Sequence, residues 1–367
     1  MSITKEQVLD ALRNVDDPDL HKDIVTLGMV KDVEVSGKNV SFSVVLTTPA
    51  CPMKEMIHKA CVNAVLYYID KEALVKVNMT SNVTSHRAPD TSTLAGVKNI
   101  VAVASGKGGV GKSTIAANLA VGLSKQGAKV GLIDADIYGP SMPIMFDVEK
   151  GRPKMQNING RDLMIPVESH GVKILSIGFF AESSQAIVWR GPMASRALTQ
   201  MLTDTEWGDL DYLIIDLPPG TGDIHLSLVG AVKLTGAIIV STPQQVALAD
   251  AGKAISMFRM PAINVPVLGV VENMAYFTPA ELPENKYYIF GKDGAKRLAE
   301  QYQVPLLAEI PLVQSICEAG DAGRPAALQN NTPQATAFMD MAKAVAQQIA
   351  ITNAALLAKP VAEVKHV

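Results

Sequence analysis

Seven short apolar runs, separated by segments with helical periodicity, dominate the chain from Lys98 onward and restrict its fold. They read "NIVAVAS", "KVGLID", "KILSIG", "YLIIDLP", "GAIIVST", "VLGVVEN" and "PLLAEIP". Near-continuous apolar strands that alternate with helices predict an α/β fold with a mostly parallel sheet and helices on both faces, because both faces of such strands are buried. We expect the chemistry at the carboxyl ends of these strands, where this architecture places its sites.

A glycine-rich segment, "SGKGGVGKST", follows the first run and precedes the helical segment "TIAANLAVGLSKQG". Its spacing satisfies the phosphate-loop pattern GxxxxGK[ST] in the required strand, loop and helix context. Glycines let backbone N–H groups converge on phosphate oxygens, and the helix amino terminus adds positive potential. A ligand-free turn is the alternative, but the context favours a nucleotide site. The predicted nucleotide contacts are Gly106, Lys107, Gly108, Gly109, Val110, Gly111, Lys112, Ser113 and Thr114.

Within this loop, Lys112 is expected to reach the β- and γ-phosphates of ATP and Ser113 to ligate Mg²⁺. Asp134 and Asp136 end or follow the second run, and Asp216 ends the fourth. Such aspartates often only cap helices or form turns. Three of them behind one phosphate loop instead indicate a site for nucleotide and Mg²⁺.

The second lysine of the loop, Lys107, makes "KGGVGKST" resemble the deviant P-loop of the ParA/MinD class of ATPases. The resemblance implies that Lys107 crosses a homodimer interface to the partner's nucleotide; a solvated surface lysine is the alternative. It further implies that Asp134 supports the Mg²⁺ shell and Asp136 positions the attacking water. Asp216 would be the Walker B acid, followed by the γ-phosphate-sensing switch "PPGTGD".

Three further residues are nucleotide-binding candidates through the same resemblance. Asn273 would read the adenine edge, and Pro311 with Leu312 would pack on the base. The Asn273 amide has the donor and acceptor that adenine recognition needs. A helix-capping asparagine would look the same in the sequence.

Together the pieces "SGKGGVGKST", "DADIYGPS", "WRGPM", "DLPPGTGD", "ENM" and "DAGRP" resemble the Mrp/ApbC branch of these ATPases. That branch implies a P-loop NTPase fold and a slow, Mg²⁺-dependent ATPase that works as a cytoplasmic homodimer. It also implies an iron–sulfur cluster that is bound and transferred to apoproteins, with assembly factors as further partners.

Residues before Lys98 predict a small α+β domain. A helix is expected over 3–15, strands in "MVKDVEVSG", "NVSFSVVLTT" and "ALVKVNMT", and a second helix over about 53–69. At "DDPDL", "DIVTLGMV" and "TTPACP" this module resembles the MIP18-type domain fused to the branch. The expected domains are 1–84, a linker 85–97, an ATPase domain 98–355 and a flexible tail 356–367.

Cys51 is the residue of chemical interest in the small domain. With Pro52 expected as the first residue of a helix, the thiolate would be favoured, which raises metal affinity. The resemblance implies a cysteine here that is linked to cluster biogenesis, so Cys51 is a candidate iron–sulfur ligand. A small buried residue is the alternative. Cys61 shares a helical face with Met53, Ile57 and Ala64 and is expected in the core.

The chain departs from the branch after "ENM", where most relatives carry a CPxC pair. Here the loop reads "AYFTPAELPENKYYIFG" and contains no cysteine. Two alternatives to cluster carriage therefore stay open: an assembly switch or scaffold that ligates no cluster, and a ParA/MinD-like positioning ATPase.

Composition bears on the second of these alternatives and on location. A net charge of -3 gives no electrostatic case for stable nucleic-acid binding, and no run is long and apolar enough to span a bilayer. The carboxyl-terminal segment is sparingly charged, so membrane binding is not expected either. Three cysteines without paired spacing and an amino terminus without signal-peptide character favour the cytoplasm.

Overall fold

The computed structural model describes residues 3–86, 94–137, 139–180, 191–279, 281–282 and 284–358. The chain divides into two compact units, one formed by Met1–His86 with Ala346–Val367 and the other by Arg87–Val345. Most of the predicted linker and of the predicted tail, at 87–93 and 359–367, lies outside the described residues, as do Trp189 and Arg190 of "WRGPM". No helix among the described residues has the length and apolar character needed to cross a bilayer.

The first unit has a three-stranded sheet in the order β3-β4-β5. β4 pairs antiparallel with β3 and parallel with β5. Its alternation buries Val40, Phe42, Val44 and Leu46 against the helices, while the intervening residues face outward. Its elements are α1 (Lys5–Leu12), β1 (Asp16–Asp17), β2 (Lys22–Asp23), β3 (Val30–Ser36), β4 (Asn39–Leu46), α2 (Lys54–Tyr68) and β5 (Leu74–Ser81).

Two sequence expectations for this unit have different outcomes. Cys61 lies in the core with no exposed surface, as expected, and burial raises the pKa of its thiol to about 12. The expected helix start at Pro52 is wrong. α2 begins at Lys54, because Met53 has a ψ angle of 4° and residues 52 and 53 form a turn.

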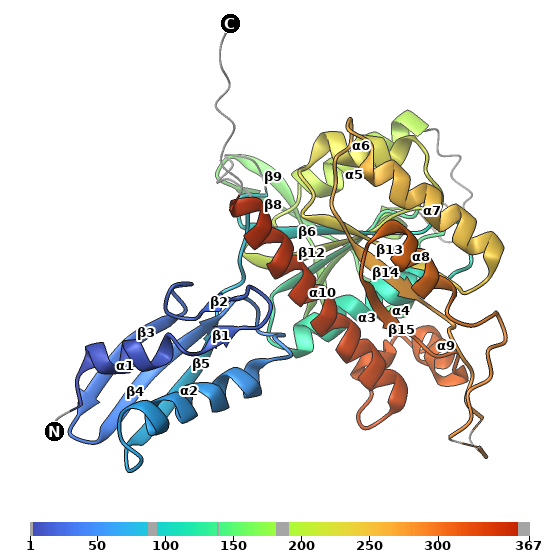
Figure 1. Ribbon diagram of the computed structural model, residues 1–367. Coiled ribbons are helices and arrows are strands. Elements are labelled where there is room, and N and C mark those ends of the chain that lie inside the picture. The colour runs from blue at the N-terminus through green and yellow to red at the C-terminus, as the bar shows by residue number, and fades with distance from the viewer. Residues whose placement is uncertain are drawn as a thin grey trace, which may run out of the picture. The chain divides into compact units, whose positions relative to one another are not determined.

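The second unit contains an eight-stranded sheet in the order β10-β11-β7-β12-β6-β13-β14-β15. Its strands β12, β6, β13 and β14 are labelled in Figure 1. Every pairing in it is parallel except that of β10 with β11. The predicted α/β fold with a mostly parallel sheet is confirmed. The antiparallel edge strand β10 is not among the predicted strands. The strands are β6 (Val97–Ala104), β7 (Val130–Asp134), β10 (Val167–Ser169), β11 (Val172–Ser176), β12 (Leu210–Asp216), β13 (Gly236–Ser241), β14 (Val267–Glu272) and β15 (Leu306–Glu309).

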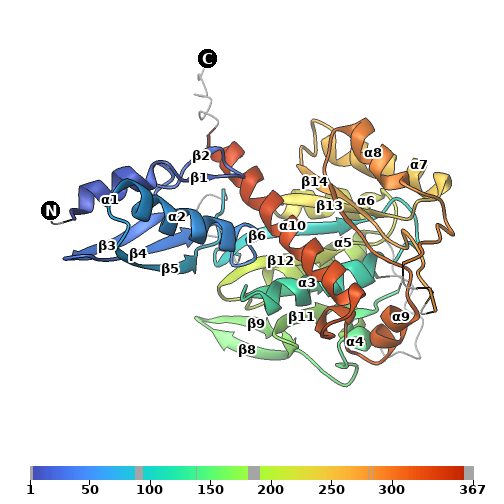
Figure 2. The same ribbon diagram turned by 60° about the horizontal axis from the view of Figure 1, so that its bottom comes forward.

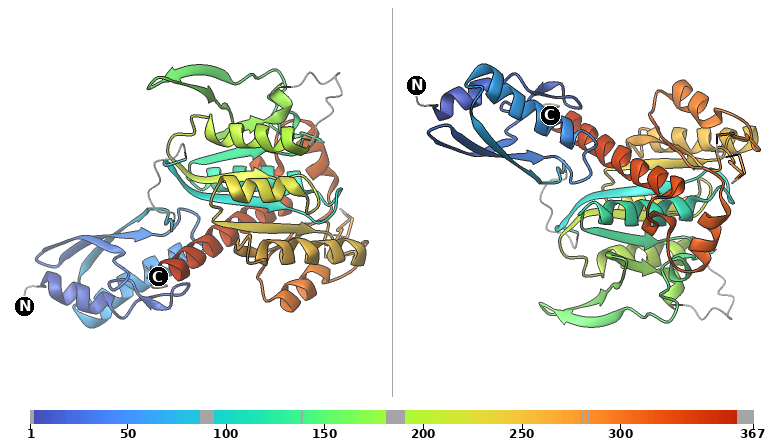
Figure 3. Two further views of the ribbon diagram at one scale, coloured as in Figure 1. Left: turned by 90° about the horizontal axis from the view of Figure 1, so that it is seen from above. Right: turned by 90° about the horizontal axis from the view of Figure 1, so that it is seen from below.

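Helices cover both faces of this sheet. α5, α6 and α7 lie on one face, and α3 and the first part of α10 lie on the other (Figure 3). The helical elements are α3 (Lys112–Lys125), α4 (Met142–Met145), η1 (Ile177–Phe180), α5 (Gly191–Thr203), α6 (Asp223–Ala231), α7 (Gln245–Arg259), α8 (Gly294–Tyr302), α9 (Gln314–Asp321), η2 (Ala326–Leu328) and α10 (Pro333–Leu357). A separate antiparallel hairpin is formed by β8 (Lys154–Ile158) and β9 (Arg161–Ile165) (Figure 2), and Met164 of β9 bridges to Thr205.

The packing of α10 on α3 depends on small residues. A Cβ placed on Gly122 would lie 2.9 Å from the Ala342 Cβ and 3.5 Å from the Phe338 carbonyl oxygen. Phe338 itself is fully buried. The end of α10 belongs to the first unit, where Asn353 donates to the carbonyl of Thr84 at 2.9 Å.

Because the Phe338 ring is fully buried, Phe338→Ala should lower the free energy of unfolding by about 3–5 kcal/mol, the usual cost of such a cavity. Denaturant unfolding followed by tryptophan fluorescence measures this unit, since Trp189 and Trp207 both belong to it. Val246→Ala, at a 61% exposed position, is the matched control and should change stability by less than about 0.5 kcal/mol. Equal losses in both variants would contradict the packing described for α10.

Candidate nucleotide site

The glycine-rich loop between β6 and α3 has the conformation that its sequence predicts. Gly109 and Gly111 have φ angles of 81° and 80°, in the left-handed region that favours glycine. A Cβ on Gly111 would lie 2.2 Å from the Asn273 Nδ2, and one on Gly106 would lie 2.1 Å from the Asp250 backbone. The loop is therefore closely enclosed, and it presents the amino terminus of α3 to the cavity beside it.

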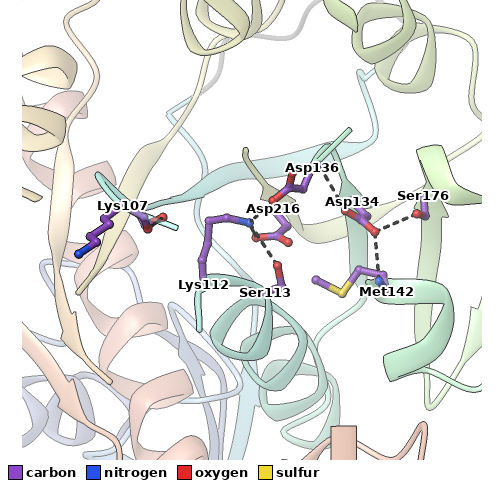
Figure 4. A network of polar contacts seen from close by, with 9 residues as sticks. Lys107, Lys112, Ser113, Asp134, Asp136, Met142, Ser176 and Asp216 are labelled. Carbon is purple, nitrogen blue, oxygen red and sulfur yellow. Dashed lines mark hydrogen bonds and ion pairs between the residues drawn. The ribbon is translucent and has the colours of Figure 1, made fainter. Parts of the chain in front are cut away.

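Lys112, the first residue of α3, is held by Asp216 at the end of β12 and by Asp136, which follows β7. Its Nζ donates to Asp216 Oδ1 at 2.6 Å and to Ser113 Oγ at 3.2 Å, and lies 3.5 Å from Asp136 Oδ2 (Figure 4). The lysine is only 6% exposed. Its charge is thus oriented inside the site, at the end of the loop where anionic phosphates are expected.

Asp134 and Asp216 face each other across neighbouring parallel strands, at the carboxyl ends of β7 and β12. Asp134 accepts hydrogen bonds from Ser176 Oγ at 2.8 Å and from the Met142 N–H at 3.1 Å. Burial, with Asp216 nearby, raises the pKa of Asp134 to about 7. No sequence pattern indicated Ser176 or Met142, because they support Asp134 only through the folded arrangement of β11 and α4.

The side-chain oxygens of Ser113, Asp134 and Asp216 form a ligand set that suits Mg²⁺. Among the described residues, the buried Asp216 Oδ2 has no hydrogen-bond partner, and the Ser113 hydroxyl accepts from the same lysine as Asp216 Oδ1. Burial raises the pKa of Asp216, whereas the Lys112 charge lowers it. Hard oxygen ligands of this kind, two carboxylates and a hydroxyl, are those that Mg²⁺ prefers. The residues predicted for the metal, Ser113, Asp134 and Asp216, therefore fit it.

A cavity of about 540 Å³ opens beside the loop and has the size of a small-molecule site. Gly108 to Thr114 line it, excepting Val110, and so do Asp136, Asn273, Pro311 and Leu312. The structure thus gathers most of the predicted nucleotide residues in one place. Its far wall comes from α4 and α9, which the sequence motifs did not indicate; it consists of Ile144, Met145, Ile316, Cys317, Gly320 and Asp321.

Asn273 supports the loop directly. Its Nδ2 donates to the Val110 carbonyl at 2.8 Å, and its side chain occupies the space that a Cβ on Gly111 would need. Pro311 and Leu312 follow β15, and Leu312 donates its N–H to the Tyr276 carbonyl at 2.8 Å. Contact of these three residues with adenine stays a prediction.

The side chain of Lys107 points in a different direction from that of Lys112 (Figure 4). Lys107 is exposed, and its side chain points away from the cluster formed by Lys112, Asp136 and Asp216 (Figure 4). Ser105 Oγ donates to the Lys107 carbonyl at 3.0 Å, which fixes the backbone beneath it. The Lys107 ammonium therefore does not contribute to the ion pairs of its own loop.

The loop after "ENM" forms a short hairpin with exposed aromatics. Phe277 and Tyr287 pair as an antiparallel bridge, and the Lys286 ammonium lies 4.0 Å from the Tyr276 ring centroid. Phe277, Leu282, Tyr287, Tyr288 and Ile289 are exposed. The hairpin is an aromatic surface in the place where the resemblance implied thiolates.

Cys51, in the first unit, lies in the turn before α2 and is half-buried. Burial raises the pKa of its thiol and the charges of Asp19 and Asp17 raise it further, although the backbone of Met53 and Lys54 lowers it. The expectation that Cys51 is a favoured thiolate is therefore wrong, because burial and the two aspartates outweigh the effect of the helix start. Within the described ranges of the chain, no three or more histidine, cysteine, aspartate or glutamate side chains are grouped so that they could hold a metal ion.

Comparison with known proteins agrees with this geometry. The family described as NUBPL iron-transfer P-loop NTPase matches residues 96–346. The chain belongs to this family. A second family, described as iron-sulfur cluster assembly protein, matches residues 5–79 in the first unit.

Two curated relatives extend this match to nearly the whole chain. An iron–sulfur cluster carrier protein of Synechocystis is 44% identical over 351 residues, covering 95% of this chain and 99% of the relative. One of Deinococcus radiodurans is 47% identical over 347 residues, covering 94% and 96%. A solved nucleotide-binding protein of Archaeoglobus fulgidus, in complex with ADP, has 39% identity and a TM-score of 0.56 over 66% of this chain and 92% of its own.

The surroundings of Cys51 yield a pH-dependent prediction. Asp19 raises the pKa of the thiol, so Asp19→Asn should lower that pKa and move the rise of alkylation rate with pH to lower pH. Iodoacetamide labelling of Cys51, followed by peptide mass spectrometry over a pH range of about 7 to 9.5 around the usual thiol pKa, measures this. Asp10→Asn, on the exposed side of α1, is the control. Coincident profiles for Asp19→Asn and wild type would show that Asp19 does not act on the thiol.

Proposed function

We propose that the protein is an ATP-binding and ATP-hydrolysing carrier that binds an iron–sulfur cluster as cargo and transfers it to apoproteins. The observation that carries the nucleotide part is the buried Lys112, held by Asp216 and Asp136 at the start of α3 beside a cavity of about 540 Å³. Membership in an iron-transfer NTPase family supports the cargo. We place the protein in the cytoplasm, where free cysteines stay reduced.

In the mechanism that we propose, phosphate oxygens of ATP compete with the two carboxylates for the Lys112 ammonium. The N–H groups of the loop and the start of α3 bind the same phosphates. Asp136, once released from Lys112, can accept a hydrogen bond from the attacking water and align it. Ser113, Asp134 and Asp216 would hold Mg²⁺, which when bound neutralises charge on the phosphates.

Hydrolysis in this proposal is slow and coupled to dimerisation. Lys107 points away from its own loop, so its ammonium is available to a nucleotide bound by a second copy of the chain. A cation supplied across an interface stabilises charge that develops on the transferred phosphoryl group. Turnover of ATP then depends on assembly of the homodimer, which suits a protein that switches between two assembly states.

Alanine variants of the two lysines separate the role of Lys112 in nucleotide binding from the role of Lys107 in dimerisation and hydrolysis. Lys112→Ala should weaken ATP binding by about a hundredfold or more, because a buried cation is lost from the phosphate site. Lys107→Ala should keep ATP affinity within about threefold, the effect of an exposed charge, but lose ATP-dependent dimerisation and hydrolysis. Isothermal titration and light scattering after gel filtration measure the two effects. Micromolar ATP binding by Lys112→Ala would exclude the phosphate-loop assignment, and an ATP-dependent dimer of Lys107→Ala would exclude the role of Lys107.

The ligands of the cluster are the second part of the proposal. A four-cysteine cluster site exceeds the three cysteines of one chain, and Cys61 is in the core. Cys51 is half-buried and available, so we propose that Cys51 ligates the cluster together with groups of a second copy or of a partner. The absence of a CPxC pair favours one alternative, an ATP-dependent switch or scaffold for assembly factors that ligates no cluster.

Anaerobic reconstitution tests this choice. Wild type should retain iron and sulfide with charge-transfer absorbance, and Cys51→Ser should lose both. Cys317→Ser, an exposed cysteine of the other unit, should behave as wild type. Wild type without retained iron, but with ATP-dependent binding of assembly factors, would support the switch or scaffold. Iron retained equally by Cys51→Ser would move the cluster to other ligands.

A further inference from the structure

His225 is a buried titratable side chain that the mechanism above does not use. It lies in the first turn of α6, directly after the segment Pro218–Gly222, and is 2% exposed. Among the described residues neither ring nitrogen has a hydrogen-bond partner. Histidine is uncommon in protein interiors without a partner, because buried polar groups are almost always hydrogen-bonded.

The backbone around this imidazole is the segment that borders the nucleotide cavity. Pro219 lines the cavity, and its ring lies 3.9 Å from a Cβ placed on Gly108. Gly220 donates its N–H to the Ser105 carbonyl at 2.8 Å, which ties the segment to the phosphate loop. At the other end, the His225 N–H donates to the Gly222 carbonyl at 3.1 Å. The segment therefore connects the phosphate loop to His225 over a few residues.

Between these two attachments the segment is exposed and loosely surrounded. Thr221 and Gly222 are exposed, Gly220 has a φ angle of 97°, and a Cβ on Gly220 or Gly222 would meet nothing within 4 Å. The carbonyls of Gly222 and Pro218 lie near enough to the imidazole to raise its pKa, without the geometry of a hydrogen bond. Burial nevertheless lowers the pKa of His225, and the Lys112 charge adds to this, so the ring is neutral and has one N–H to donate.

We propose that His225 is a positioning residue for Pro218–Gly222, donating a ring N–H to a backbone carbonyl of that segment when ATP draws the segment toward the phosphate loop. The hydrogen bond then forms only in the ATP-bound arrangement. It removes the cost of the unpaired imidazole and so favours the arrangement that is competent for hydrolysis. This inference rests on the proposed ATPase function and adds one residue to it.

His225→Leu tests the proposal because it removes both nitrogens at similar volume. Without nucleotide the variant should melt at the same or a higher temperature than wild type, since no unpaired polar group stays buried. ADP affinity should stay within about twofold, while kcat for ATP should fall about tenfold, the effect of one hydrogen bond made only in the active arrangement. His225→Gln, which keeps an amide N–H, should recover most of the lost turnover.

Hydrogen exchange separates this proposal from the ATPase assignment. ATP should protect the backbone amides of 220–222 in wild type and in His225→Gln but not in His225→Leu, and this readout does not require turnover. Wild type that binds ATP and protects the segment without hydrolysing it would refute the ATPase function alone. Full protection and wild-type kcat in His225→Leu would overturn the role of His225. A loss of turnover shared by His225→Leu and His225→Gln, with lower melting temperatures in both, would show that the residue only packs.

Discussion

The buried ion pair between Lys112 and Asp216 is the interaction on which the rest of the site depends. Burying two charges is costly unless they are paired, and removal of one partner from such a pair typically costs about 3–5 kcal/mol. Here the end of β12 supplies the carboxylate and the start of α3 supplies the ammonium. The strand and the helix must therefore be correctly placed relative to each other for the two buried charges to pair. The sheet order that places β12 between β6 and β7 is therefore also the order that assembles the phosphate site.

The same pair explains why the neighbouring acidic groups differ in character. Asp216 has the lysine on one oxygen and a second oxygen without a partner among the described residues, which suits a cation ligand. Asp134, one strand away, makes no ion pair with that lysine; burial raises its pKa, and Ser176 and the Met142 N–H hold its carboxyl in place. Asp136 is 13% exposed and lies 3.5 Å from the ammonium of the same lysine. Three aspartates thus acquire three chemical characters from their different surroundings.

Much of this could be predicted from the sequence, because strand periodicity and the loop motif are local. The seven apolar runs correspond to the parallel strands of the sheet. Residues of the glycine-rich loop line one cavity together with Asp136, Asn273 and Pro311. Residues that act through tertiary contacts carried no such signal. The support of Asp134 by Ser176, like the far wall of the cavity, depends on which strand follows which in space. For Cys51, helix proximity suggested a thiolate, but burial and two aspartates outweighed it.

The segment that begins with "ENM" combines a residue fixed against the phosphate loop with a hairpin that makes no such contact. Asn273 is fixed by its hydrogen bond to Val110 and by its contact with Gly111, so substitution there would disturb the phosphate loop itself. A few residues later, the hairpin bridge of Phe277 with Tyr287 needs only backbone pairing, which any side chains can satisfy. Ligands in the hairpin are therefore free to vary without loss of the ATP site. In our proposal the cluster is therefore held outside this hairpin, and the half-buried Cys51 is the thiol that we assign to it.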